Sequence, residues 1–442
     1  MLVAYLLGCI VLIVVLTSRL RIHPFIVLLL VGLTYGFLAG MPSDQIVASV
    51  NEGFGKTLSG IGLIIVLGVI IGVFLENTGG AYAIAEKILR FLGKKNVTPA
   101  MGIMGYVVSI PVYADSGFLL LSPLKKSLCK SAGLTLSGAT IALSLGLTVS
   151  HTMVPPTPGP IAAAGILDAN LGQVLLIGLP VSLIALAVSI LFAMAYVSRI
   201  HIDPSSTGAT DAAPAPSKDS PSALKSLLPI IVPIGLILSK SVAQMLQLPA
   251  TPLLSIINFL GTPFIALLAG TFLALLLPKK LELNMLSCDG WIGKALTGSA
   301  SIILITGAGG AFGKILQNSG IATGLGTLIS EWSLGIWLPF LLAAAIKTAQ
   351  GSSTVALITT ASILAPLMGE LGFVSELDKA LVVIAIGAGS AVVSHANDSF
   401  FWVVTQMSGM DVRTGYRTHT LGTLVMGTSS ALVVFGIYST FS

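Results

Sequence analysis

The sequence predicts an all-α polytopic membrane protein, built as an inverted-topology repeat with about ten transmembrane helices and two re-entrant helical hairpins. Three observations predict this class: an apolar composition, apolar runs of spanning length, and matching motifs in the two halves. Of the 442 residues, 55% are hydrophobic and only 9% are charged, whereas soluble domains carry about 25% charged residues. The mean hydropathy is +0.99.

Ten segments are apolar and long enough to be interpreted as spans, because about 20 apolar residues cross a hydrocarbon core of about 30 Å. They are residues 2 to 18, 24 to 40, 57 to 76, 134 to 165, 173 to 197, 226 to 247, 254 to 277, 296 to 316, 379 to 405 and 420 to 440. Two further apolar regions, 100 to 124 and 335 to 368, are interrupted by Pro, Gly or polar residues. Each half of these regions is too short to cross at about 1.5 Å per residue. We therefore expect each region to enter the membrane and turn back.

Basic residues are enriched on the cytoplasmic side of membrane proteins. With the N-terminus outside, most of the 22 basic residues fall in cytoplasmic loops, including Lys125, Lys126 and Lys130 after the first hairpin. This bias holds only if the region 100 to 124 returns to the side from which it entered, because both of its flanks are basic. The same topology places the central linker in the cytoplasm and the C-terminus outside. The lysines that it does not explain are Lys56, Lys240, Lys314, Lys347 and Lys379.

A linker rich in proline and serine, residues 201 to 225, divides the chain into comparable halves. We expect a first repeat in residues 1 to 200 and a second in residues 226 to 442. Val149-Ser150-His151 in the first half recurs as Val393-Ser394-His395 in the second. Because the first half begins outside and the second inside, the halves are inverted in the membrane. Inverted repeats with broken helices are typical of secondary transporters whose site lies near the midplane.

The second hairpin contains a run of hydroxyl groups at its tip. Ser352, Ser353 and Thr354 would begin the returning half-helix, whose free N–H groups suit a carboxylate. Lys347 would supply a full positive charge, and Gln350 belongs to the same turn. The alternative is that this run only satisfies backbone groups at a helix break, and that Lys347 extends toward the interface.

The tip of the first hairpin carries Asp115-Ser116-Gly117. An ionised carboxylate is costly at membrane depth, so Asp115 is a candidate carrier of a coupling proton. Ser116 and Gly117 are candidate substrate contacts. The alternative is that Asp115 only caps a half-helix that starts at Gly117.

Prolines mark the first broken helix. Residues 155 to 160 contain four prolines, and no regular helix survives that sequence. Unwound backbone at membrane depth must be buried or face water, so we expect its carbonyls and hydroxyls to face a substrate or a cation. His151 and Thr152, directly before the prolines, are candidate substrate-binding residues.

The second broken helix carries His395, Asn397 and Asp398. His395 and Asn397 are candidate substrate-binding residues, and histidine titrates readily near neutral pH. Asp398 is the second candidate carrier of the coupling proton. The alternative for Asp398 is an ion pair with Lys347 that neutralises both charges.

The sequence excludes several other classes. Nothing in it matches a phosphate-binding loop, which favours an ion gradient over ATP as the energy source. Cys9, Cys129 and Cys288 lack the spacing of a disulfide framework or metal site. We expect no cofactor and no metal, with the proton as coupling ion and sodium as the alternative. The expected partners are a small organic anion and the lipid bilayer, with no nucleic acid, and the chain could assemble as a homodimer.

Three stretches carry a resemblance to a known family: Lys347 to Ala356, Gly387 to Ser390 leading into Ser394 to Trp402, and Gly307 to Phe312. They resemble the gluconate permease family of the ion transporter superfamily. The resemblance implies proton-coupled uptake of gluconate and related sugar acids through a bacterial inner (plasma) membrane. The first half departs from the family pattern, because Ala114-Asp115-Ser116 stands where members tend to have a Glu flanked by Val.

We therefore expect a secondary active transporter that imports gluconate or a related small hydroxycarboxylate with protons. The first alternative is a sodium-coupled or exchange transporter of a shorter carboxylate, such as glycerate or lactate, or of D-serine. A passive channel is another. The rival from a different class is an intramembrane enzyme that uses Ser, His and Asp, although Ser352 lacks the spacing of a nucleophile elbow.

Overall fold

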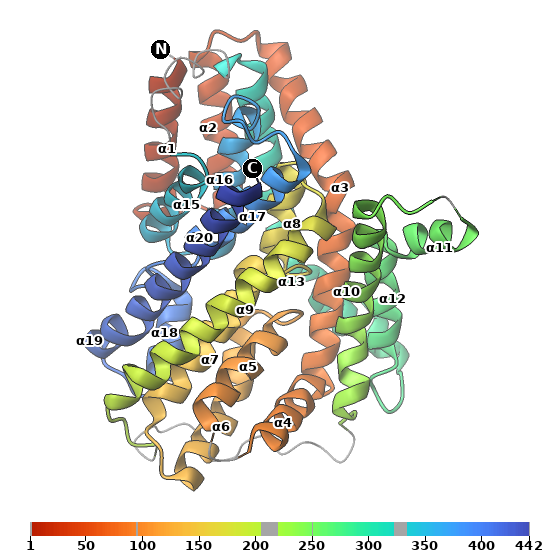
Figure 1. Cartoon of the computed structure of the whole chain (residues 1–442). Coiled ribbons are helices and arrows are strands. Elements are labelled where there is room, and N and C mark those ends of the chain that lie inside the picture. The colour runs from red at the N-terminus through yellow and green to blue at the C-terminus, as the bar shows by residue number, and fades with distance from the viewer. Residues whose placement is uncertain (1, 94–95, 205–219, 250, 322–333, 442) are drawn as a thin grey trace.

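The computed structural model describes residues 2–93, 96–204, 220–249, 251–321 and 334–441, and every regular element within them is a helix (Figure 1). The helices of the first half are α1 (Leu2–Ser18), α2 (Pro24–Leu38), α3 (Ser43–Asn77), α4 (Gly80–Leu92), α5 (Val97–Ser109), α6 (Ala114–Ala132), α7 (Leu136–Met153), α8 (Pro158–Ile166) and α9 (Leu171–Ala195). Residues 205–219 of the predicted linker, Lys94 and Lys95 lie outside the described residues.

The second half contains α10 (Ala223–Met245), α11 (Pro252–Leu260), α12 (Pro263–Leu275), α13 (Trp291–Asn318), α15 (Trp337–Gln350), α16 (Ser353–Leu364), α17 (Glu376–Gly389), α18 (Ser399–Gln406), α19 (Val412–Gly415) and α20 (Leu421–Phe441). Short segments are the 3₁₀ turns η1 (Val197–Arg199), η2 (Leu283–Leu286) and η3 (Ala365–Leu367) and the π-helical η4 (Tyr416–Thr420).

The two halves place similar elements in the same order. A long helix (α3, α13) precedes a pair of helices joined by a short break (α5 and α6, α15 and α16), then a broken helix and a last helix. The last helices, α9 and α20, pack side by side and run in opposite directions (Figure 1). This order and direction fit the predicted inverted repeat, which stays a prediction.

Both predicted hairpins contain a break at the expected place. The pair α5 and α6 lies in the lower part of Figure 1, and the pair α15 and α16 lies in the upper part. Helix α6 begins at Ala114, and Gly117 N already donates to Tyr113 O over 2.8 Å. Asp115 therefore lies in the first helical turn, earlier than the predicted start at Gly117. That the pairs re-enter the membrane stays a prediction.

Fewer helices than ten meet the criteria for a membrane span. Within the described residues, five helical stretches are long and apolar enough to cross a membrane, and the pair α11 and α12 would add a sixth. This pair bends by 70°, so the span predicted at 254 to 277 is two helices. Pro263 starts the second helix. Proline has no backbone N–H and clashes with the preceding turn, so it is disfavoured in the interior of a helix. The count of ten spans stays a prediction.

The two broken helices differ in the length of their breaks. Helix α7 ends at Met153 and α8 already begins at Pro158, because proline is tolerated in the first turn of a helix. The first break is therefore shorter than the predicted unwound segment of residues 155 to 160. In the second half, α17 ends at Gly389 and α18 begins at Ser399, so the second break starts before the predicted one.

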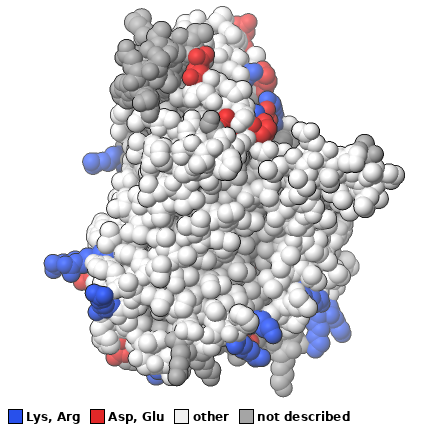
Figure 2. Space-filling view, in the orientation of Figure 1, with Lys and Arg blue, Asp and Glu red and all other residues white. Residues whose placement is uncertain are grey.

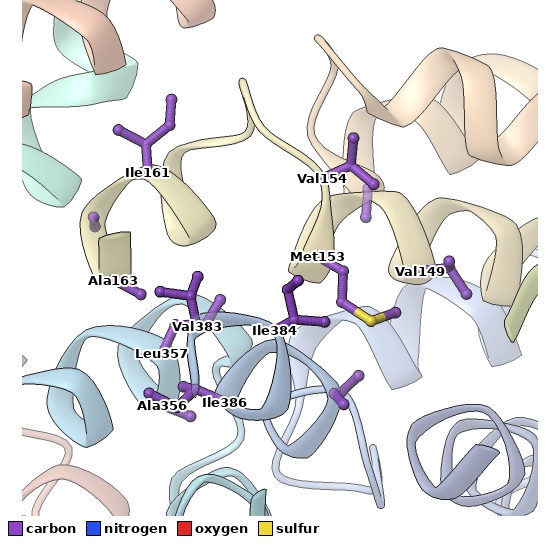
Figure 3. Close-up of a cluster of buried hydrophobic side chains, with 14 of the residues drawn as sticks. Val149, Met153, Val154, Ile161, Ala163, Ala356, Leu357, Val383, Ile384 and Ile386 are labelled. Carbon is purple, nitrogen blue, oxygen red and sulfur yellow. The ribbon is translucent and has the colours of Figure 1, made fainter. Parts of the chain in front are cut away.

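An apolar core joins these broken helices to the second hairpin. Figure 3 shows Met153 of α7 beside Ile384 of α17, and Ala163 of α8 beside Leu357 of α16. All four side chains are buried. Burial of a Met, Leu or Ile side chain contributes about 1.5–3 kcal/mol in water, and within a membrane the close packing itself supplies the stabilisation.

On the face of the molecule that Figure 2 shows, exposed charged side chains gather mainly toward the two ends. Figure 2 shows an uncharged band, with basic residues mainly at the lower end and acidic residues mainly at the upper end. Lys125 departs from its predicted place in a cytoplasmic loop, because its side chain is only 1% exposed. Its Nζ donates to Ser408 Oγ over 2.8 Å and lies 4.5 Å from the ring centre of Phe118.

Helices α3 and α13 cross closely at two glycines. A Cβ on Gly53 would lie 2.7 Å from the Cβ of Lys314 and would also collide with the backbone of Gly310. A Cβ on Gly55, two residues later on the same helix, would meet nothing within 4 Å. The crossing therefore depends on the absence of a side chain at Gly53.

We predict that Gly53→Val lowers the free energy of unfolding by about 1–3 kcal/mol more than Gly55→Val, the usual cost of overpacking. Both substitutions place the same β-branched residue in α3, so their helix propensities cancel. The melting temperatures of the two purified variants in detergent measure the difference. Equal melting temperatures would contradict the close crossing.

Candidate functional site

A cavity of about 150 Å³ lies where the hairpin tips meet the broken helices. Its walls come from α6, α7, α15, α16 and the break before α18. The lining residues are Tyr113, Ala114, Asp115, Thr148, His151, Lys347, Ser352, Ser353, Thr354, Ala391, Ser394, Asp398, Ser399 and Phe400. Residues far apart in both halves of the sequence thus meet in one place.

Three helix N-termini converge on this cavity. Helix α16 starts with Ser352 as its N-cap, whose Oγ accepts from Val355 N over 3.3 Å. Helix α18 has Asp398 as its N-cap, and α6 starts next to Tyr113. The first N–H groups of a helix have no partner within the helix, and its dipole favours negative charge. The cavity is therefore suited to an anion.

A buried ion pair lies in the cavity wall. Lys347 Nζ is 2.6 Å from Asp398 Oδ2, and the lysine also donates to Gly351 O. The Asp398 carboxylate accepts two further bonds, from Ser394 Oγ over 2.5 Å and from Phe400 N over 3.0 Å. For Asp398, the sequence left open either a proton-carrying role or an ion pair with Lys347, and this ion pair is present in the structure. Each charge is held by several hydrogen bonds, as a buried charge requires.

Two polar atoms in the cavity wall lack a hydrogen-bond partner among the described residues. They are Tyr113 Oη and His151 Nδ1, and both are buried. The two rings face each other with 6.2 Å between their centres. Buried polar groups are normally satisfied, so these atoms are positioned to bond a ligand. Both also line a small adjoining pocket beside Pro156, Thr157 and Pro158.

The hydroxyl of Thr148, rather than that of Thr152, reaches the cavity. Thr148 lies one turn earlier on α7 and lines the cavity. Thr152 is buried outside the lining, and its Oγ1 donates to Thr148 O over 3.0 Å. The two threonines lie on the same face of α7 one turn apart, so they differ in position along the helix relative to the cavity, which a motif in the sequence does not reveal.

His395 and Asn397 lie outside the lining and connect the two broken elements. His395 Nε2 is 2.9 Å from Thr348 O, and Asn397 Nδ2 donates to the same carbonyl over 2.8 Å. They hold the second break against the end of α15. Gly351 makes this approach possible, because its φ is +91° and a Cβ there would collide with the backbone of Asn397.

Of the remaining predicted residues, one lines the cavity and three lie outside its lining. Asp115 lines the cavity with an exposed side chain. Ser116 and Gly117 lie outside the lining, and Gly117 packs against Leu147. Gln350 also lies outside, and its Nε2 donates to Ser352 O within its own turn.

Several lining residues were absent from the sequence-based prediction. They are Tyr113, Ala114, Thr148, Ala391, Ser394, Ser399 and Phe400. Tyr113 and Ser394 are neighbours of predicted residues in the same motifs, so extending each motif by one or two positions would have included them. Thr148 carries no comparable signal.

A larger cavity of about 560 Å³ lies between α3, α8, α13 and the α11–α12 turn. Its charged lining residues include Lys56, Asp168 and Lys314, and Lys314 pairs with Glu52 at 2.7 Å. The unpartnered Tyr113 and His151 atoms lie in the wall of the smaller cavity and not in this one. The smaller cavity is therefore the stronger candidate for the binding site.

Comparison with known proteins places the chain in a family. The model of the GntP family permease matches residues 1–440. The chain belongs to the GntP permease family. A gluconate permease of Pseudomonas aeruginosa is 34% identical over 417 residues, which cover 92% of this chain and 91% of the relative. The high-affinity gluconate transporter of Escherichia coli is 32% identical over 410 residues, with 91% of each chain covered.

Other GntP relatives include an uncharacterized permease of Haemophilus influenzae, 35% identical over 416 residues that cover 90% of this chain and 84% of the relative. The solved structure of the YdaH transporter from Alcanivorax borkumensis has the same general fold. Its TM-score is 0.62 with 15% sequence identity, covering 95% of this chain and 98% of that chain. The protein is thus a membrane permease, and membership of this family excludes the intramembrane enzyme.

Proposed function

We propose that this permease takes up gluconate or a related small hydroxycarboxylate together with protons, across the bacterial inner membrane. The observation that carries this proposal is the convergence of three helix N-termini and Lys347 on one small cavity. The names of the relatives, two of them given for gluconate, support the substrate class. A relative named an inner membrane permease supports the location.

The substrate carboxylate would bind at the start of α16. Ser352, Ser353 and Thr354 bring hydroxyl groups and free backbone N–H groups to the cavity. Charge-assisted hydrogen bonds of this kind are about twice as strong as neutral ones. Lys347, on the facing end of α15, would complete the charge balance once it is free of Asp398.

The hydroxyl groups of the substrate would bind on the opposite wall. Tyr113 Oη and His151 Nδ1 have no partner among the described residues, and Thr148 Oγ1 uses its hydrogen on Ser144 O at 2.8 Å. The Thr148 oxygen can therefore accept a hydrogen bond from a ligand. A ligand with a carboxylate at one end and hydroxyl groups along its chain satisfies both walls.

The charges in the cavity support the proposed proton coupling. Lys347 is neutralised by Asp398, and Asp115 adds a second carboxylate. A substrate anion that entered this arrangement would be repelled. A proton on Asp398 would release the ammonium of Lys347 for the substrate, and a proton on Asp115 would remove the remaining repulsion. By linkage, proton and substrate then favour each other's binding.

Alternating access would move the hairpins and the broken helices relative to the paired helices α3 and α13. Transporters of inverted repeats work by such motion around a central site. In the predicted topology the N- and C-termini are outside and the central linker is cytoplasmic. A homodimer also stays a prediction.

The second candidate function is sodium-coupled uptake or exchange of a shorter carboxylate, such as glycerate or lactate, or of D-serine. The cavity volume of about 150 Å³ favours it, because an engineered cavity of about that volume binds benzene. A short hydroxy acid fits that space as it is. Gluconate requires the hairpin tips to separate somewhat.

We predict that purified protein in proteoliposomes accumulates radiolabelled gluconate when the outside is acidic. With one proton per substrate, a gradient of about one pH unit supports about tenfold accumulation. Parallel uptake of glycerate, lactate and D-serine, with and without sodium, identifies the preferred substrate and ion. Accumulation that needs sodium but no pH gradient would favour the second candidate, and no uptake of any acid would overturn both.

We predict that Asp398→Asn abolishes accumulation in a pH gradient and retains counterflow exchange. Asparagine imitates a permanently protonated carboxyl, so the site can load substrate but cannot release a proton. Asp115→Asn tests the second carboxylate in the same assay. If both variants concentrate substrate as well as the unmodified protein does, neither residue carries the coupling proton.

We predict that Thr148→Val weakens substrate binding about tenfold, whereas Thr152→Val leaves the affinity unchanged. Both changes remove a hydroxyl from a buried position of α7, but only that of Thr148 reaches the cavity. A lost hydrogen bond costs about 0.5–1.5 kcal/mol. Dissociation constants from calorimetry on the two variants measure the difference. A larger loss in Thr152→Val would place the ligand elsewhere.

A further inference from the structure

A third histidine, His419, lies directly behind the candidate site. It belongs to the π-helical segment η4 (Tyr416–Thr420), and its side chain is fully buried. Single π-helical turns are rare and occur often at functional sites. The rings of Phe400 and Phe401 lie 5.6 Å and 6.2 Å from the imidazole.

His419 ends a chain of buried hydrogen bonds that begins at the ion pair. Its Nε2 is 3.1 Å from Ser394 Oγ, and Ser394 Oγ donates to Asp398 Oδ2 over 2.5 Å. Asp398 in turn pairs with Lys347. On the other side of the ring, Nδ1 is 3.2 Å from Ser144 Oγ, and Ser144 Oγ donates to Ile141 O over 3.0 Å.

Counting hydrogens along this chain defines two states. A serine hydroxyl has one hydrogen to donate. With the hydrogen of Ser394 on Asp398 and that of Ser144 on Ile141 O, each serine oxygen can accept from the His419 nitrogen that it faces, and each hydroxyl can also rotate to donate to that nitrogen. A doubly protonated imidazole satisfies both contacts. With a neutral imidazole, one of the two serines turns its hydrogen to the unprotonated nitrogen. When Ser394 does so, Asp398 keeps the bonds from Lys347 and Phe400 N but loses the one from Ser394, and a protonated Asp398 can then donate to Ser394 Oγ.

We propose that His419 is a proton-relay residue that exchanges the coupling proton with Asp398 through the hydroxyl of Ser394. The Nε2–H bond of His419 breaks and its proton passes to Ser394 Oγ, while the hydroxyl hydrogen of Ser394 passes to Asp398 Oδ2. Imidazolium and carboxylate become neutral imidazole and carboxylic acid, and no charge leaves the chain. The relay rests on the proton coupling proposed above.

The structure holds Ser394 in place for this exchange. Ser394 N donates to Thr423 Oγ1 over 3.1 Å, and Thr420 Oγ1 donates to Ser394 O over 2.5 Å. Val393, the preceding residue, has a φ of +52°. A β-branched residue rarely adopts this conformation, and such strain persists only where the surroundings impose it.

The hydrogen-bond chain through Ser394 links His419 to Asp398 and Lys347, which carry charges of opposite sign. The elements packed around the ring otherwise present Ser144 of α7 and the phenylalanines of α18, and η4 itself carries Tyr416 and Arg417. The occupancy of the proton on His419 is therefore tied to the state of the ion pair. Substrate that binds Lys347 would shift the proton in the chain.

The test compares accumulation and exchange in proteoliposomes of the full chain. We expect His419→Gln and Ser394→Ala to reduce gluconate accumulation under a pH gradient at least tenfold more than they reduce counterflow exchange. Glutamine keeps a donor and an acceptor but holds no extra proton. Ser394→Thr should restore accumulation, because it keeps the hydroxyl. Ser390→Ala is the matched control, since Ser390 is also fully buried but donates to Gly387 O of its own helix.

Accumulation by Ser394→Ala at the level of Ser390→Ala would overturn the relay. The Ser394→Ala and Ser394→Thr pair decides the outcome if His419→Gln does not fold. The relay would also be overturned if Ser394→Thr lost as much accumulation as Ser394→Ala. Accumulation would then not depend on the hydroxyl group at this position. Failure of the unmodified protein to accumulate substrate under a pH gradient would instead overturn proton coupling itself.

Discussion

The ion pair between Lys347 and Asp398 is the interaction on which the rest of the site depends. Both charges are almost completely buried, with exposed fractions of 1% and 8%. A buried pair is tolerable only when further hydrogen bonds satisfy each partner. Unbroken helices could not supply these bonds, because their carbonyl and N–H groups bond within the helix. The pair therefore requires the free carbonyl of Gly351 and the free N–H of Phe400, which exist only at breaks.

The same breaks produce the helix N-termini of the candidate anion site. A helix that stops and restarts in the middle of a protein exposes N–H groups at each new start. Here α16 and α18 start within the cavity wall, and α6 starts on the facing side. The hydrogen bonds of His395 and Asn397 to Thr348 O fix the two second-half breaks relative to each other. The architecture that allows a charge to be buried thus also creates the site that can bind one.

The sequence predicted those parts of the fold that depend on the local residue composition. Low charge and long apolar runs indicated membrane helices, and the prolines after His151 indicated the first break. The serines after Gln350 indicated the second hairpin, because hydroxyl-rich runs cap new helices. Each of these features lies within a short stretch of sequence, so it can be recognised without knowing how the helices pack.

Other features depend on which way a side chain points or on contacts between distant residues. Thr148 and Thr152 are chemically identical, and only the packing of α7 decides which of them reaches the cavity. Lys125 was counted with the loop charges because basic residues flank it, yet its helix turns it inward onto Ser408. His419 lies more than twenty residues from the predicted motif and has no repeated counterpart. A π-helical turn places it there, and no sequence pattern used here indicates one.

The energy of the ion pair gives a physical reason for the coupling of proton and substrate that we propose. Removal of one partner from a buried pair typically costs about 3–5 kcal/mol, because the other charge is left uncompensated. A proton on Asp398 alone would leave Lys347 in that condition, and a substrate carboxylate would then supply the missing negative charge. At about 1.4 kcal/mol per factor of ten, the state with a proton and no substrate would be disfavoured by roughly two to three orders of magnitude. The pair would therefore limit proton leakage without a separate gate.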